Sequence, residues 1–94
     1  MTLDITIRRA QKKPAAYVLM SGDGRYLYKG ACRNLKERLK DHRAGRVSHT
    51  KNCRPLKLVY HEYYETYSEA LKKEMSLKSG QGRQWLKQFL TQET

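Results

Sequence analysis

The sequence predicts an α+β fold, in which a small three-stranded, mainly antiparallel sheet is flanked by about three helices. Two short β-prone runs around a strong turn signal predict a hairpin, and a third β-prone run lies between segments with helical periodicity. Because 94 residues bury only a modest core, we expect a single domain, spanning residues 15–94. Residues 1–14 are polar and basic, and we expect them to form a flexible tail.

The hairpin is predicted from Tyr17–Met20 and Arg25–Tyr28, which flank residues 21–24. The intervening Ser-Gly-Asp-Gly is typical of a tight turn, because glycine and aspartate tolerate the backbone angles that such turns require. Pro55 introduces a third strand, which we expect to extend over Leu56–Tyr64.

Three helices are expected. Asn34 is a suitable N-cap for a first helix over Leu35–Arg43, and Gly45 is placed to end it. A second helix is expected over Glu69–Lys78. A last helix, Arg83–Leu90, places its aromatic and leucine side chains at the spacing of a core-facing stripe.

The charge of the chain indicates a polyanionic partner. Its formal net charge is +11, and nine basic residues lie between Arg33 and Lys57 against only Glu37 and Asp41. A positive field of this size attracts polyanions, and nucleic acid is the commonest of these in the cytosol. A basic surface without any chemistry carries the same charge, so charge alone does not distinguish a nucleic-acid binder from an enzyme.

The two cysteines, Cys32 and Cys53, form no disulfide framework, and no apolar run approaches the length of a membrane span. We therefore expect a cytoplasmic protein with reduced thiols and no membrane partner. A zinc site made from these cysteines with His42 and His49 is rejected, because the spacings fit no usual arrangement of zinc ligands.

Two helices carry charged or polar groups beside their apolar stripes. Glu74 falls in the middle of the apolar arc of the second helix, where a carboxylate is costly to bury unless it is paired or holds a metal. Pairing with Lys78, one turn later, and a metal site both remain open. On the first helix, Arg38 and His42 lie on the same side as Leu35, where they either form a solvated basic face or bind a phosphate. The second helix's apolar arc consists of Tyr67, Ala70, Leu71, Met75 and Leu77.

The hairpin brings two tyrosines onto one face of the sheet. If the turn centres on Gly22 and Asp23, Tyr17 lies directly opposite Tyr28, and Tyr26 is on the same face. A turn centred one residue later changes this register. An aromatic cross-strand pair is a common packing feature, so the pair alone does not indicate catalysis.

Together these residues resemble the motifs of the GIY-YIG nuclease superfamily. The first motif reads Ala15-Ala16-Tyr17 and the second Tyr28-Lys29-Gly30, while Arg38, His42 and Glu74 follow in the family's order and approximate spacing. The sequence is similar to the N-terminal nuclease domain of the excinuclease of nucleotide excision repair. It is more similar to small stand-alone bacterial members in which Arg-Pro-x-x-Leu-Val-Tyr follows, here residues 54–60. Both residues before Tyr17 depart from the glycine and isoleucine of the family, and Ala31 stands where some members carry lysine.

The resemblance implies an active site for phosphodiester hydrolysis. Glu74 would hold one divalent ion, Mg²⁺ or Mn²⁺, and Arg38 would contact the phosphate oxygens. Tyr17 would act as general base or orient the water, with Tyr28 in support. His42 would share the base role or form a hydrogen bond with Tyr17. A tyrosine needs nearby cations to act as a base, and Lys29 and Arg38 are expected to supply them.

The resulting prediction is a metal-dependent DNA endonuclease that acts in repair or recombination, on DNA that includes structured or damaged forms. The alternative is a non-catalytic nucleic-acid-binding module that retains the fold, and a third interpretation is a protein whose tyrosines only pack. The oligomeric state stays open. We expect the DNA to be contacted by Lys29, Arg33, Lys36, Arg43, Arg46, His49, Lys51 and Arg54.

Overall fold

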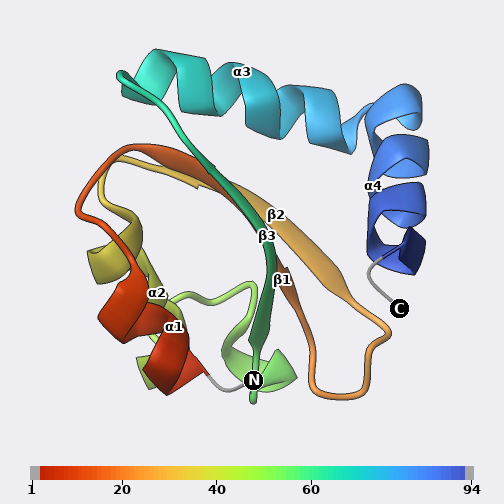
Figure 1. Cartoon of the computed structure of the whole chain (residues 1–94). Coiled ribbons are helices and arrows are strands. Elements are labelled where there is room, and N and C mark those ends of the chain that lie inside the picture. The colour runs from red at the N-terminus through yellow and green to blue at the C-terminus, as the bar shows by residue number, and fades with distance from the viewer. Residues whose placement is uncertain (1–2, 93–94) are drawn as a thin grey trace.

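The computed structural model describes residues 3–92 and confirms the predicted α+β fold. The sheet contains β1 (Ala15–Met20), β2 (Leu27–Cys32) and β3 (Lys57–Tyr63), all antiparallel, in the order β2-β1-β3. β1 is therefore the central strand, and β2 and β3 form the two edges of the sheet (Figure 1). The helices are α1 (Leu3–Arg9), α2 (Leu35–Ala44), α3 (Tyr67–Lys78) and α4 (Gly80–Gln92).

Helix α1 is the element that the sequence pattern did not predict. Residues 1–14 were expected to be a flexible tail, and for Leu3–Arg9 that prediction is wrong. Leu3 and Ile7, four residues apart, lie on one side of α1 and are both buried in the core. Their burial anchors the helix beside α2, where Asp4 accepts a 2.6 Å hydrogen bond from Arg43.

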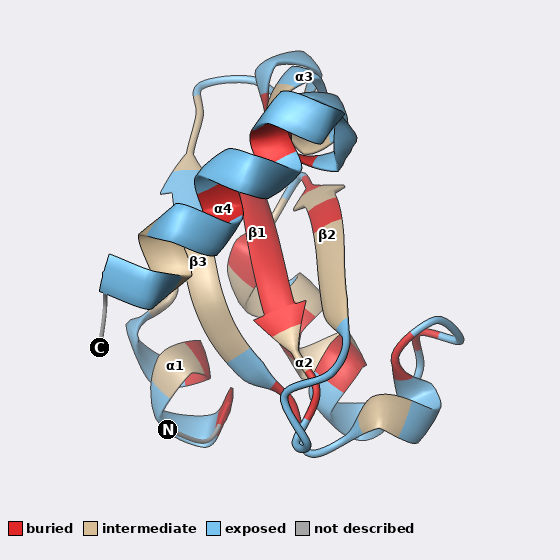
Figure 2. Cartoon of the chain, turned by 90° about the vertical axis from the view of Figure 1, so that its right-hand side faces the viewer, coloured by how far each residue is buried: buried red, intermediate tan, exposed pale blue. Residues whose placement is uncertain are grey.

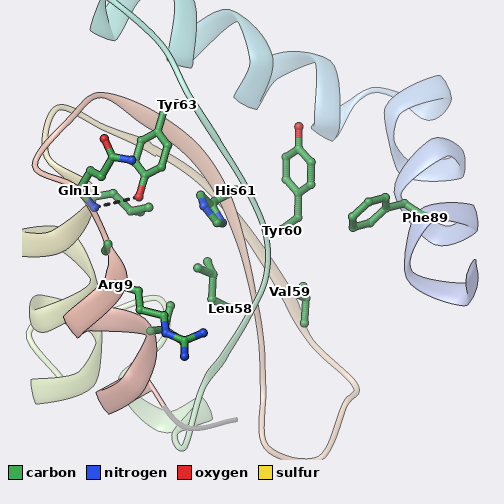
Figure 3. Close-up of a pocket in the computed structure, with 11 residues that line it drawn as sticks. Arg9, Gln11, Leu58, Val59, Tyr60, His61, Tyr63 and Phe89 are labelled. Atoms are coloured by element: carbon green, nitrogen blue, oxygen red, sulfur yellow. Dashed lines mark hydrogen bonds between the residues drawn. The ribbon is translucent and has the colours of Figure 1, made fainter. Parts of the chain in front are cut away.

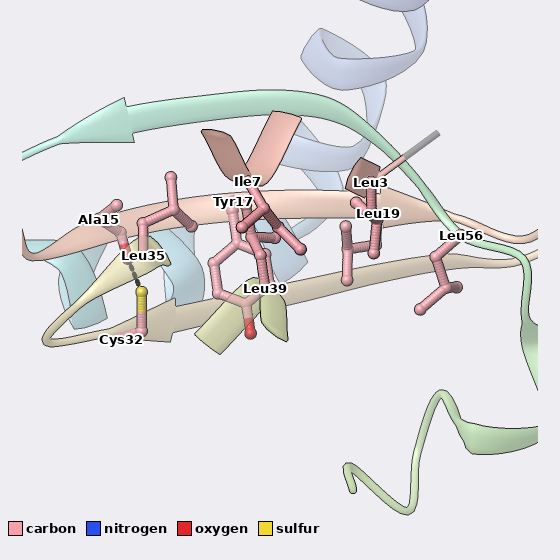
Figure 4. Packing of buried hydrophobic residues seen from close by; sticks show 9 residues of the cluster. All are labelled: Leu3, Ile7, Ala15, Tyr17, Leu19, Cys32, Leu35, Leu39 and Leu56. Carbon is pink, nitrogen blue, oxygen red and sulfur yellow. Dashed lines mark hydrogen bonds between the residues drawn. The ribbon is translucent and has the colours of Figure 1, made fainter. Parts of the chain in front are cut away.

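The helices cover the two faces of the sheet in pairs (Figure 1). α1 and α2 pack on the face that carries Tyr17 and Leu19, and this larger core is shown in Figure 4. α3 and α4 pack on the other face, where Val18 contacts Leu77 and Leu86. Figure 2 shows that β1 is buried almost along its whole length, as expected for a central strand covered on both faces.

Capping interactions fix where the two site-bearing helices begin and end. The Asn34 side chain accepts a 3.1 Å hydrogen bond from the backbone N–H of Glu37, and Gly45 ends α2 in the left-handed conformation, with φ of 79°. At α3, Thr66 and Glu69 form a reciprocal capping box. The predicted caps of α2 are thus confirmed.

The hairpin register differs from the expected one by two residues. Tyr17 lies opposite Gly30, and Tyr28 lies opposite Leu19, so the two tyrosines are diagonal neighbours on the same face. The connection is longer than a two-residue turn because Ser21 donates its backbone N–H to the carbonyl of Tyr26, and β2 starts only after that bond. Tyr26 lies outside β2 and is exposed, so it does not belong to the buried tyrosine cluster.

The outer surfaces of α3 and α4 expose two side chains that we expected in the core. Met75 is 71% exposed, because the apolar face of α3 turns towards the sheet through Ala70 and Leu77 instead. Trp85 is 42% exposed and stacks against Phe89 at the rim. Within residues 3–92, no helix has both the length and the apolar character needed to cross a membrane.

Candidate active site

Tyr17 stands at the centre of a buried polar cluster on the α2 side of the sheet. Its side chain is fully buried, and its hydroxyl lies 2.8 Å from Nε2 of His42 on α2. The Tyr17 ring passes directly over Gly30 of β2, where any Cβ atom would lie 2.6 Å from the phenol oxygen. Glycine is required here because the tyrosine occupies the space of a side chain.

Replacing Gly30 by alanine is therefore expected to displace the Tyr17 ring and to lower the free energy of unfolding by about 1–3 kcal/mol, as overpacking does elsewhere. The matched control is Gly80→Ala, because no atom lies within 4 Å of the Cβ position at Gly80. Urea denaturation of both variants measures the difference. Equal stability of the two variants would contradict the close approach of Tyr17 to β2.

His42 links Tyr17 to Thr50 through its two ring nitrogens. Nε2 faces the Tyr17 hydroxyl, and Nδ1 lies 2.7 Å from Oγ1 of Thr50, which is also fully buried. Burial, reinforced by the nearby Arg38 cation, lowers the pKa of His42 to about 4, so the imidazole is neutral near pH 7. Thr50 was not among the predicted site residues, since a threonine in a basic loop carries no sequence signal of a buried contact.

The neutral state of His42 predicts that acid destabilises the protein. The folded pKa of His42, about 4, lies below its ordinary value of 6.5, so the unfolded chain binds more protons between these pH values. We expect stability to fall as the pH drops from about 7 to 4, with about 3 kcal/mol of the loss due to His42. Urea denaturation across this range should show a smaller pH-dependent loss in His42→Gln than in the wild type. A loss of equal size would contradict the buried neutral imidazole.

Tyr28 and Arg38 form the more exposed side of the cluster. The Tyr28 ring lies 6.2 Å from the ring of Tyr17 and 5.2 Å from that of His42, measured between centroids. Burial alone would lower the pKa of Arg38, but hydrogen bonding and charge interactions with Tyr17 and Tyr28 outweigh it and raise that pKa. The exposed His49 lies 6.1 Å from Tyr28, so it extends the cluster towards solvent.

The cluster holds Tyr17 in its neutral form. Burial raises the pKa of Tyr17 well above its usual value, and interaction with Arg38 offsets only part of this effect. Lys29 does not help, because it lies on the opposite face of β2 from Tyr28, beside Arg83. The expectation that Lys29 favours the Tyr17 phenolate is therefore wrong.

Glu74 projects from α3 near the same edge of the sheet. Its side chain is 18% exposed and forms an ion pair with Nζ of Lys78 at 2.9 Å, which is the pairing that the sequence left open. The bond to Glu74 is the largest cause that raises the pKa of Lys78, and weaker charge interactions with Tyr28 and Tyr26 add to it. Among residues 3–92, no group of three or more acidic, histidine or cysteine side chains is placed to hold a metal.

Most of the residues expected to contact DNA are spread over the α2 side of the molecule, whereas Lys29 lies on the opposite face. Arg33 lies 4.2 Å from the centroid of the Tyr67 ring, and Arg33 and Arg38 both line a depression of about 370 Å³ next to the cluster. Arg46 pairs with Asp41 at the end of α2. Four more lie towards α1, where they contact backbone carbonyls or Asp4 or line a cavity there; these are Lys36, Arg43, Lys51 and Arg54.

A cavity of about 630 Å³ lies at the other edge of the sheet, beside β3 (Figure 3). Its wall includes Tyr63, whose hydroxyl accepts a hydrogen bond from the backbone of Gln11, and it extends to Phe89 of α4. It contains none of the predicted site residues. The candidate site is therefore the cluster at the β2 edge.

Comparison with known proteins gives a family match over most of the chain. Residues 13–88 match the family model described as the GIY-YIG catalytic domain. The UPF0213 proteins of Staphylococcus aureus strains Mu3, Mu50 and COL are each 42% identical to this chain over 64 residues, which cover 67% of it and 77% of each relative. No solved structure matches the chain. The range matched by the family model includes every candidate catalytic residue.

Proposed function

We propose that this chain, which belongs to the GIY-YIG family of nucleases, is a divalent-metal-dependent endonuclease that hydrolyses phosphodiester bonds in DNA. The observation that carries the proposal is the convergence of Tyr17, Tyr28, Arg38 and His42 at one edge of the sheet. A role in repair or recombination, on structured or damaged DNA, is part of the proposal.

Arg38 would bind the scissile phosphate. Its guanidinium is partly exposed and lines the depression beside the cluster, while its other side interacts with the two tyrosines. A planar guanidinium donates two parallel hydrogen bonds to phosphate oxygens and stabilises the charge that grows on them as water attacks. The tyrosine contacts orient Arg38 for this role.

Tyr17 and His42 would transfer the proton of the attacking water. When His42 carries its proton on Nδ1, it donates to Thr50 and accepts from the Tyr17 hydroxyl at Nε2. As water attacks phosphorus and the bond to the 3′ oxygen breaks, the water proton would pass to the Tyr17 oxygen while the phenol proton passes to Nε2, and the leaving 3′ oxygen would take a proton from solvent. Tyr28, between the buried pair and solvent, would position the water.

Glu74 would hold the divalent ion, and water and the substrate phosphate would supply the other ligands. Mg²⁺ commonly binds through one or two carboxylates and keeps several waters, and Glu74 offers one partly exposed carboxylate. When bound, the ion would neutralise phosphate charge and acidify coordinated water. Lys78 would leave Glu74 at that moment and would remain close enough to contact DNA.

The second candidate function is a non-catalytic nucleic-acid-binding module. The neutral Tyr17 and the weakly basic His42 favour it, because neither group is a strong base in the free protein. A carboxylate beside the cluster argues against it, because pure binding of a polyanion gains nothing from Glu74.

The deciding experiment is a cleavage assay on supercoiled, branched and single-stranded DNA, with Mg²⁺, with Mn²⁺ and with a chelator. An endonuclease nicks at least one substrate only when the metal is present. Binding to all three substrates without cleavage of any would establish the binding module instead.

A further inference from the structure

A groove of about 560 Å³ runs between the start of β2 and the side of α4 that faces the sheet. Its floor is apolar and its rim is basic, and no acidic residue lines it. The floor consists of Leu27, Leu86 and Leu90, and the rim of Lys29, Arg83 and Lys87. Three cations from two different elements thus surround one apolar surface.

The cations of the rim have no carboxylate partners within residues 3–92. The acidic members of the ion pairs in this part of the chain are Asp4, Glu37, Asp41 and Glu74, and none of them pairs with the rim. Partial burial lowers the pKa of Lys29, and repulsion from Arg83 and Lys78 lowers it further. An unpaired cluster of like charges is stabilised by an anionic ligand.

The groove and the candidate active site lie on opposite faces of the same edge strand. Tyr28 and Lys29 are successive residues of β2, so their side chains point to opposite faces of the sheet. Lys78, the partner of Glu74, interacts electrostatically with both of them. Because β2 is an edge strand, a nucleic-acid strand that passes this edge can reach both surfaces.

We propose that this groove binds a single-stranded segment of the nucleic-acid substrate, with phosphates on Lys29, Arg83 and Lys87 and a base against the leucine floor. A duplex keeps its bases stacked inside and cannot place one against the leucine floor, so it does not settle into the groove and the apolar floor favours an unpaired strand. This inference rests on the proposed function, because it treats the groove as an extension of the nuclease site.

The test measures binding without divalent metal, by fluorescence anisotropy, to a blunt duplex and to the same duplex with a single-stranded overhang. Arg83→Gln/Lys87→Gln removes two exposed cations of α4, and Lys57→Gln/Lys72→Gln removes two exposed cations elsewhere as the matched control. We expect Arg83→Gln/Lys87→Gln to weaken binding of the overhang substrate by about tenfold. The salt slope, meaning the slope of the logarithm of the binding constant against the logarithm of the salt concentration, should fall in magnitude by about 1.4, the value for two single-strand phosphates. Binding of the blunt duplex should change by less than about twofold.

A third variant, Leu90→Gln, changes the floor without changing charge. It should weaken overhang binding while leaving the salt slope as in the wild type. The proposal is overturned if the α4 variant weakens both substrates equally, or if it behaves like the control. Melting curves verify that each variant is folded.

The outcome is independent of catalysis. If the wild type cleaves DNA but the α4 variant binds the overhang normally, only the groove is rejected. If the wild type cleaves nothing but the α4 variant loses overhang binding, the groove stands and the nuclease proposal falls.

Discussion

Replacing Arg38 by alanine is expected to slow metal-dependent DNA cleavage by about 10²–10³-fold, the usual cost of removing one donor that stabilises charge in the transition state. The loss should appear mainly in the single-turnover rate at saturating DNA, because the other basic residues still supply most of the binding. Arg38→Lys keeps the charge without the planar fork and should recover only part of the rate.

The matched control for Arg38 is Lys40→Ala on the same helix. Lys40 pairs with Glu37 on the surface of α2, away from the tyrosines, so its removal tests for a general effect of lost positive charge. Cleavage at the same rate by Arg38→Ala and Lys40→Ala would refute the assignment of Arg38 to the scissile phosphate.

Replacing Glu74 by glutamine is expected to reduce cleavage at least about 10²-fold and to remove its dependence on Mg²⁺ concentration, because the amide keeps the shape of the side chain but binds the ion poorly. The fold should persist, because a partly exposed ion pair such as Glu74–Lys78 contributes only about 0–1 kcal/mol. Single-turnover rates across a Mg²⁺ titration provide the measurement.

Lys78→Gln separates the two roles that are open for Glu74. It breaks the same ion pair but leaves the carboxylate available for a metal. If Glu74 serves only as the partner of Lys78, Lys78→Gln and Glu74→Gln will have the same effect on metal-dependent cleavage. We expect instead that Lys78→Gln retains metal-dependent cleavage and that Glu74→Gln loses it.

Local sequence signals predicted the elements of this fold well. The caps at Asn34 and Gly45 fix α2 through side-chain and backbone preferences that act within a few residues, so they can be read from the sequence. The β-prone runs predicted β1 and β3 to within two residues, but the run predicted at Arg25–Tyr28 overlaps β2, Leu27–Cys32, only at its first two residues. Helix α1 was missed because only Leu3 and Ile7 mark its buried side, and two residues do not establish a period.

Features that depend on contacts between distant residues were not accessible. The backbone bond between Ser21 and Tyr26 sets which residue of β2 lies opposite Tyr17. The residues of the turn are compatible with both a two-residue turn and this longer connection, so they do not predict the register. The position of Lys29 is a different case, because strand alternation places it on the face opposite Tyr28 in either register. Thr50 reaches His42 only because the loop after α2 folds back over the cluster.

The candidate site itself was predicted through a family resemblance rather than from patterning. Tyr17, Arg38 and His42 do converge, but their burial gives them properties that the sequence does not display: a histidine with a pKa of about 4 and a tyrosine held neutral. Glu74 is connected to this cluster only through Lys78, which pairs with Glu74 and interacts electrostatically with Tyr28.

Whether Glu74 and the tyrosine cluster form one metal-dependent site is tested most directly by Mn²⁺ titration of protein with isotopically labelled tyrosine and histidine rings. The paramagnetic ion broadens the signals of nuclei close to it and requires no catalysis. We predict that the ring signals of Tyr28 and His49 broaden first in the wild type and not in Glu74→Gln. Broadening that begins elsewhere, or that persists unchanged in Glu74→Gln, would contradict a metal at this site.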